Sequence, residues 1–131
     1  MFEEQTVFEN QSLSGALDGG GITELRSPVV LGAGPVGRAL VSRLGARGLT
    51  PVLVTRSGTT VAGARSSAVD VTDAGALAAA LQGADAVFHC AAKVEEWGDP
   101  ADFHRINVEG TERVLRAARE AGAGRFVHVS T

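Results

Sequence analysis

A short apolar strand followed at once by a glycine-rich turn constrains the fold of this chain more than any other feature. Val29-Val30-Leu31 is short and apolar enough for a buried strand, and Gly32-Ala33-Gly34-Pro35-Val36-Gly37 follows directly. Pro35 suits the first position of a helix, where its missing N–H group costs nothing. The glycines at 32, 34 and 37 therefore lie between a buried strand and a helix start, which is the context of a dinucleotide-binding fingerprint.

Each glycine of this turn has a separate task. Gly32 permits the tight turn, Gly34 lets a pyrophosphate approach the backbone, and Gly37 lets the helix pack closely on the strand. The helix N-terminus then offers free N–H groups and a partial positive charge to the anion. We interpret Gly32, Gly34, Pro35, Val36 and Gly37 as cofactor-binding residues. The alternative is a strand–helix turn that holds no ligand.

Apolar runs and helical periods alternate along the rest of the chain. Further strands are predicted at residues 51–55, 67–71, 86–91 and 125–130, with helices at 35–47, at 73–82 and from Pro100 up to Gly124. Strands that alternate with helices indicate a parallel sheet with right-handed crossovers. We expect an α/β fold, a Rossmann-like doubly wound parallel sheet of strand order 3-2-1-4-5, truncated after the fifth strand.

Composition divides the chain and excludes several classes of protein. Residues 1–27 contain five acidic groups and one arginine, and predict a flexible leader or at most one short added element. Residues 28–131 form the dinucleotide-binding domain. No apolar run is long enough to span a membrane, and no basic stripe interleaved with aromatic residues suggests nucleic acid. The single cysteine and the lack of metal-ligand spacing indicate a cytoplasmic protein without a metal site.

The end of the second strand bears on the choice of dinucleotide. An NAD site usually places Asp or Glu about 20 residues after the first glycine, where it binds the ribose 2′-hydroxyl. Thr55 stands 23 residues after Gly32, and Arg56 is next. Neither residue repels a 2′-phosphate, and an arginine can bind one through two N–H groups. We therefore expect NADP, with NAD kept as an alternative; otherwise Arg56 only solvates the turn before Ser57-Gly58.

The end of the third strand predicts the adenine-binding residues. Asp70 and Val71 lie where the adenine ring of a bound dinucleotide is expected, and the Asp70 carboxylate can accept a hydrogen bond from the exocyclic amine. The alternative is that Asp70 or Thr72 only caps the next helix.

Five side chains near the fourth and fifth strands have both a structural and a functional interpretation. His89 and Cys90 are expected to be core side chains rather than catalytic ones. Lys93 and Trp97 lie beyond the carboxyl end of the fourth strand, where open α/β sheets bind ligands, so either can touch substrate or nicotinamide. Asn107 is on the inward face of its helix, where its amide either bonds strand backbones or also shapes the site.

Several motifs occur together in the order of a known family. They are the glycine turn, Asp70-Val71, His89-Cys90-Ala91-Ala92-Lys93, Asn107-Val108-Glu109-Gly110-Thr111 and Phe126-Val127-His128-Val129-Ser130-Thr131. Residues 28–131 thus resemble the N-terminal half of extended short-chain dehydrogenases/reductases, the NAD-dependent epimerase/dehydratase superfamily. They are most similar to its 3β-hydroxysteroid dehydrogenase and dihydroflavonol-reductase branch.

The resemblance implies roles for further residues. Ala91, Ala92, Lys93 and Asn107 fall among the cofactor-binding positions. Thr131 falls where the family keeps the Ser or Thr that polarises the substrate oxygen, with Ser130 as the alternative one residue earlier. The family's first motif glycine falls on Leu31, so Gly32 serves instead. The family's acid/base Tyr-x-x-x-Lys pair has no counterpart, because the sequence contains no tyrosine and its only lysine is Lys93.

The resemblance implies the dinucleotide-binding half of an NAD(P)-dependent oxidoreductase that acts on a carbonyl or secondary alcohol. Because the Tyr-x-x-x-Lys half is missing, we expect these residues to be inactive alone. A non-catalytic NAD(P)-binding sensor and a fragment of a sugar-nucleotide epimerase or dehydratase are the alternatives. The expected partners are the dinucleotide and, only in the complete protein, a small-molecule substrate; a homodimer stays open.

Overall fold

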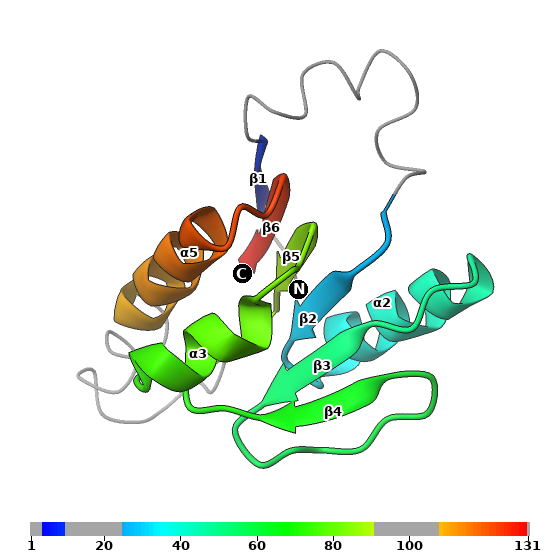
Figure 1. Cartoon of the computed structure of the whole chain (residues 1–131). Helices are drawn as coiled ribbons and strands as arrows, with labels where there is room; N and C mark the ends of the chain where they lie inside the picture. Colours follow the sequence, from blue (N-terminus) through cyan, green and yellow to red (C-terminus); the bar gives the residue numbers. More distant parts are fainter. Residues whose placement is uncertain (1–3, 10–24, 91–107, 131) are drawn as a thin grey trace.

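A six-stranded sheet organises residues 4–9, 25–90 and 108–130, which are the residues that the computed structural model describes (Figure 1). The strands are β1 (Glu4–Glu9), β2 (Pro28–Leu31), β3 (Val52–Thr55), β4 (Arg65–Ala68), β5 (Ala86–His89) and β6 (Arg125–Ser130). The helices are α2 (Pro35–Ala46), α3 (Ala74–Leu81) and α5 (Gly110–Glu120). The order across the sheet is β1-β6-β5-β2-β3-β4.

The five strands from β2 to β6 form the parallel sheet that the sequence predicts. Numbered along the chain from β2, their spatial order is 3-2-1-4-5, so this prediction is confirmed. β1 adds a sixth strand, which runs antiparallel to β6 from Glu4 opposite Ser130 to Glu9 opposite Arg125. This strand falls within residues 1–27, and it joins residues 4–9 of that segment to the edge of the sheet.

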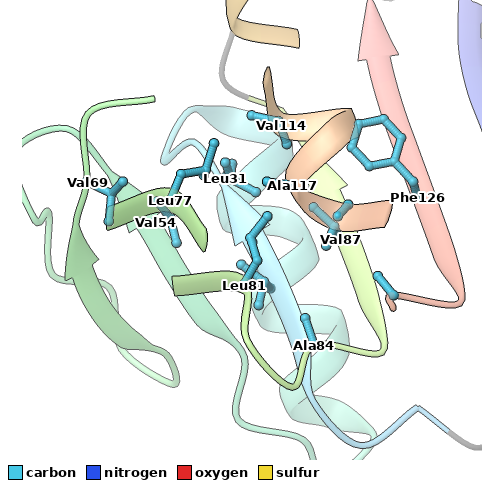
Figure 2. Close-up of a cluster of buried hydrophobic side chains, with 13 residues drawn as sticks. Leu31, Val54, Val69, Leu77, Leu81, Ala84, Val87, Val114, Ala117 and Phe126 are labelled. Carbon is cyan, nitrogen blue, oxygen red and sulfur yellow. The ribbon is translucent and has the colours of Figure 1, made fainter. Parts of the chain in front are cut away.

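Side-chain alternation along the strands supplies two apolar faces for the helices. Val30 and Leu53 point to the face that α2 covers, where they pack with Val41 and Leu44. The larger core on the other face lies beneath α3 and α5 (Figure 2). Its buried members are Val29, Leu31, Val54, Val69, Leu77, Leu81, Ala84, Val87, Val114, Ala117, Ala118, Ala123 and Phe126. The helices take opposite faces because α2 connects strands in one direction across the sheet, and α3 and α5 connect them in the other.

The structure corrects two boundaries near the end of the third parallel strand. β4 ends at Ala68 instead of residue 71, because the Asp70 carboxylate accepts hydrogen bonds from the N–H and hydroxyl of Thr72 and turns the chain. The cap of α3 is Asp73, whose Oδ1 accepts from the Ala76 N–H at 3.0 Å, and not Asp70 or Thr72. The expected helix start at Pro100 lies outside the described residues.

Candidate functional site

The glycine turn brings the end of β2 directly against the start of α2. Gly32 has a φ of 105°, a left-handed conformation that favours glycine. Its N–H donates to the Val54 carbonyl at 2.9 Å, which fixes the turn beside the end of β3. Gly34 is the residue before the helix, and Pro35 is the first residue within it. The tight turn predicted at Gly32 is thus present.

The other two glycines serve opposite purposes. A Cβ atom on Gly37 would lie 1.8 Å from the Gly32 carbonyl oxygen, so only a glycine permits this packing of helix on turn. A Cβ atom on Gly34 would meet no described atom within 4 Å, and Gly34 is exposed. Gly34 therefore leaves open space directly before the helix, where a ligand can approach the backbone.

The start of α2 is electrostatically suited to an anion. Gly34 has no side chain to cap the helix, and the first turn contains no acidic residue. The first N–H groups of a helix carry a partial positive charge that favours phosphate. The residues of the turn thus fit the pyrophosphate of a dinucleotide, in both the space that they leave and the charge that they present.

The structure brings the residues predicted to select the dinucleotide together at one edge of the sheet. The Thr55 hydroxyl, at the end of β3, accepts a hydrogen bond from the Thr59 N–H at 2.8 Å. The Arg56 Nε lies 3.8 Å from the Asp70 Oδ2, and the two side chains are 78% and 43% exposed. An exposed pair at this distance contributes little stability, so the Arg56 guanidinium is held only weakly. Val71, beyond Asp70, packs partly against the core below α3.

A pair of histidines lies below the carboxyl ends of β5 and β6. His89 and His128 are opposite each other in register, and their Nδ1 atoms are 2.9 Å apart. The rings stack with centroids 5.0 Å apart, and His89 is 2% exposed. Burial, together with the smaller effect of the nearby His128, lowers the pKa of His89 to about 4. The prediction that His89 is a hydrogen-bonded core residue is confirmed.

Cys90 follows the end of β5. Its N–H donates to the Leu31 carbonyl at 2.8 Å, and the residue is half-buried. Burial raises the pKa of its thiol to about 11. The thiolate needed for nucleophilic chemistry is therefore scarce near neutral pH. Among the described residues, no three His, Cys, Asp or Glu side chains gather to hold a metal ion.

Comparisons with known proteins identify the family of this chain. A sequence profile of the NAD dependent epimerase/dehydratase family matches residues 29–131. The 4-hydroxy-2-methyl-3-oxo-4-farnesyl-3,4-dihydroquinoline-1-oxide ketoreductase of Stigmatella aurantiaca is 39% identical over 112 residues, which cover 82% of this chain and 34% of the ketoreductase. The chain belongs to the NAD-dependent epimerase/dehydratase family.

Two further proteins are similar to this chain, one of them a short-chain dehydrogenase/reductase superfamily protein of known structure. A 3β-hydroxysteroid dehydrogenase/isomerase of Mycobacterium tuberculosis is 44% identical over 69 residues, which cover 47% of this chain and 19% of that enzyme. A superfamily protein from Agrobacterium tumefaciens, solved with bound NAD, superimposes with a TM-score of 0.65 at 35% identity, over 75% of this chain and 30% of that one. The chain spans about a third of the length of the first curated relatives that it matches.

Several expected site residues of this family member lie outside the described residues. They are Ala91, Ala92, Lys93, Trp97, Asn107 and Thr131. Ser130 is described only as the last residue of β6. Their roles as cofactor-binding or catalytic residues stay predictions, as do those of Asp70 and Val71. Within the described residues, no helix is long and apolar enough to cross a membrane.

Arg38 is a residue near the glycine turn that sequence reasoning missed. Its Nε–H donates to the Ala33 carbonyl at 2.7 Å, inside the turn itself. The signal in the sequence is its place directly after Gly37, the third glycine of the motif, where a long side chain can fold back over the turn. Sequence reasoning treated this residue only as part of the helix.

Gly37→Ala and Gly34→Ala should differ sharply in their effect on the stability of the fold. We expect Gly37→Ala to lower the free energy of unfolding by roughly 1–3 kcal/mol or more, because the helix must move away from Gly32. Gly34→Ala should cost less than about 1 kcal/mol, the cost of a poorer residue before the helix. Urea unfolding of both variants measures this, and equal losses would contradict the distinct roles of the two glycines.

Stability should also fall in acid because of His89. Its pKa in the folded protein is about 4, below the ordinary 6.5, so protons bind the unfolded chain more tightly. The free energy of unfolding is unaffected by the protonation of His89 above pH 6.5 and decreases as the pH falls towards 4. The decrease is up to about 3 kcal/mol, at about 1.4 kcal/mol per pKa unit. Urea unfolding of wild type and His89→Leu from pH 7 to pH 4 tests this. An unchanged pH slope in the variant would show that His89 is not responsible.

Proposed function

We propose that this chain binds NADP at the glycine turn, as the cofactor-binding half of an oxidoreductase that acts on a carbonyl or secondary alcohol. One observation carries the proposal. Gly37 has no room for a side chain, whereas Gly34 has open space at its Cβ position, directly before a helix N-terminus that no side chain caps. This pairing holds the helix close and leaves its positive end accessible. The expected cytoplasmic location belongs to the same proposal and rests on the acidic first residues and the single cysteine.

Support for NADP over NAD comes from the residues at the end of β3. A carboxylate there would accept a hydrogen bond from a ribose 2′-hydroxyl and repel a 2′-phosphate. This chain instead has Thr55 and Arg56, and the Arg56 side chain is 78% exposed, with its Nε 3.8 Å from the Asp70 Oδ2. The Agrobacterium protein was solved with NAD, so the NADP preference is a proposal about this chain's own two residues.

Support for carbonyl chemistry comes from the ketoreductase relative. A bound nicotinamide supplies a hydride, and the Ser130 or Thr131 hydroxyl would orient and polarise the substrate oxygen. Adjacent side chains on a strand point to opposite faces, so only one of these two hydroxyls can serve. The acid/base tyrosine that the family resemblance implies is not among these 131 residues, which contain no tyrosine. We therefore propose that they bind cofactor without turnover.

A non-catalytic dinucleotide sensor is the second candidate, because the open position at Gly34 and the uncapped start of α2 need no acid/base group to bind a dinucleotide. The two candidates agree on the cofactor site and differ only in the chemistry of the whole protein. A sequence that continues beyond Thr131 into a Tyr-x-x-x-Lys motif would favour the oxidoreductase.

The cofactor proposal predicts a preference that depends on Arg56. NADPH should bind more tightly than NADH, and Arg56→Ala should weaken NADPH binding by roughly 1–3 kcal/mol, the scale of a lost hydrogen bond to a charged group, with NADH little changed. Arg47→Ala, which removes an exposed arginine at the far end of α2, is the matched control. Calorimetric titration with both dinucleotides measures the affinities.

Two outcomes of this titration would contradict parts of the proposal. Equal affinities of the wild type for NADPH and NADH would remove the argument from Thr55 and Arg56. Gly34→Val should abolish binding of both dinucleotides, because its branched side chain would occupy the open space before the helix. Unimpaired binding by Gly34→Val would show that the turn has only a structural role.

The catalytic proposal predicts no hydride transfer by these 131 residues alone. Loss of a main acid/base group typically costs about 10²–10⁴ in rate, and substrate positioning is lost as well. The measurement is NADPH oxidation, followed by absorbance, with a panel of ketones. Steady turnover that Thr131→Val abolishes would contradict the proposal and indicate an acid/base group elsewhere, with His89, Lys93 and His128 to be tested first.

A further inference from the structure

Arg38 makes two hydrogen bonds to the glycine turn from one residue. Its backbone N–H donates to the Gly34 carbonyl at 3.0 Å, as the first bond of the helix ladder. Its side-chain Nε–H donates to the Ala33 carbonyl at 2.7 Å. Two successive carbonyls of the turn are thus held by the same residue, one through the backbone and one through a charged side chain.

The bond to Ala33 fixes more than one carbonyl. The peptide between Ala33 and Gly34 is trans, so its C=O and N–H groups point in opposite directions. Holding the Ala33 carbonyl towards Arg38 therefore directs the Gly34 N–H to the opposite side. Gly34 is the residue with open space at its Cβ position, so the orientation of its N–H group matters to any ligand there.

The charge of Arg38 is unfavourably placed for the helix by itself. A cation near the start of a helix is repelled by the partial positive charge of the first N–H groups. The first turn of α2 has no acidic residue, and within the described part of the chain Arg38 forms no ion pair. The protein therefore concentrates positive charge at the turn without a described counter-charge, and a bound anion would relieve that repulsion.

We propose that Arg38 is a positioning residue for the pyrophosphate of the dinucleotide. It holds the turn in its binding conformation through the Ala33 carbonyl and adds positive charge beside the start of α2. This inference rests on the proposed cofactor site and extends it. Because both dinucleotides contain the pyrophosphate, Arg38 acts on NADH and NADPH alike, unlike Arg56.

The test compares three variants. Arg38→Met removes both the charge and the hydrogen-bond donor, Arg38→Gln keeps an N–H donor without the charge, and Arg43→Met removes an exposed arginine farther along the same helix. The probes are NADPH, NADH, inorganic pyrophosphate and adenosine, which has no phosphate. Binding is measured by calorimetry, and thermal unfolding reports whether each variant is folded.

We expect Arg38→Met to weaken NADPH, NADH and pyrophosphate by similar factors of roughly 10- to 100-fold, the range for a lost hydrogen bond involving a charged group. Adenosine binding should not change, Arg38→Gln should lose less than Arg38→Met, and Arg43→Met should bind as the wild type does. Wild-type affinity in a folded Arg38→Met or Arg38→Gln would overturn the inference. So would an equal loss for adenosine, which indicates a general structural role.

The outcomes separate this inference from the proposed function. If the wild type and the Arg38 variants bind dinucleotides equally well, the inference alone is refuted. Wild-type protein that binds pyrophosphate through Arg38, but neither dinucleotide, would refute the proposed function and leave the inference standing. Absence of binding to all three phosphate-containing probes would refute both.

Discussion

The close approach of Gly37 to Gly32 is the contact on which the rest of the site depends. No residue with a side chain can replace Gly37 while its Cα stays in place, because a Cβ would overlap the Gly32 carbonyl oxygen. This approach brings the first turn of α2 to the end of β2, where the Gly32 N–H is already bonded to the end of β3. One backbone contact thereby sets the helix N-terminus, the turn and the neighbouring strand in a fixed relation.

The direction of the strands gathers the remaining candidate residues around that contact. In a parallel sheet the carboxyl ends of all strands lie at one edge, and the connections from that edge carry the ligand-binding residues. Thr55 ends β3, Arg56 follows it, and Asp70 comes after β4. These two strands lie on one side of β2. His89 ends β5, the strand on the other side, and bonds to His128 of β6. Residues distant in the sequence therefore share one edge of the sheet.

The parts of this arrangement that sequence could predict are those with a local signal. The strand order followed from alternating apolar runs, and the tasks of Gly32 and Gly37 followed from the spacing of the motif. The early end of β4 was missed because Asp70 and Thr72 form a side-chain turn that no hydrophobic period records. The pairing of β1 with β6 joins residues that are more than 115 positions apart in the sequence, so no local pattern could show it.

Arg38 and the histidine pair could not be predicted for a related reason. Periodicity places Arg38 on an exposed helix position, but the fold of its side chain back to Ala33 depends on the shape of the turn before it. Strand alternation predicts which face of the sheet His89 and His128 each occupy. The hydrogen bond between their rings depends on the register between β5 and β6. In both cases the sequence limits which face a residue occupies, and only the three-dimensional register selects its partner.

In the two proposals above, the two arginines near the turn recognise different parts of a dinucleotide. Arg38 is bonded to the turn itself, so its effect applies to the part that all dinucleotides share. Arg56 lies beyond the end of β3 and is mostly exposed, and its Nε is 3.8 Å from the Asp70 Oδ2, so it can move to meet a group that only some dinucleotides carry. A rigid residue suits a constant feature of the ligand, because its ordering cost is met when the protein folds. A loosely held residue suits the variable feature, since it loses freedom only when its own ligand group is present. The two proposals together therefore make the turn the source of affinity for every dinucleotide and the end of β3 the source of discrimination between them.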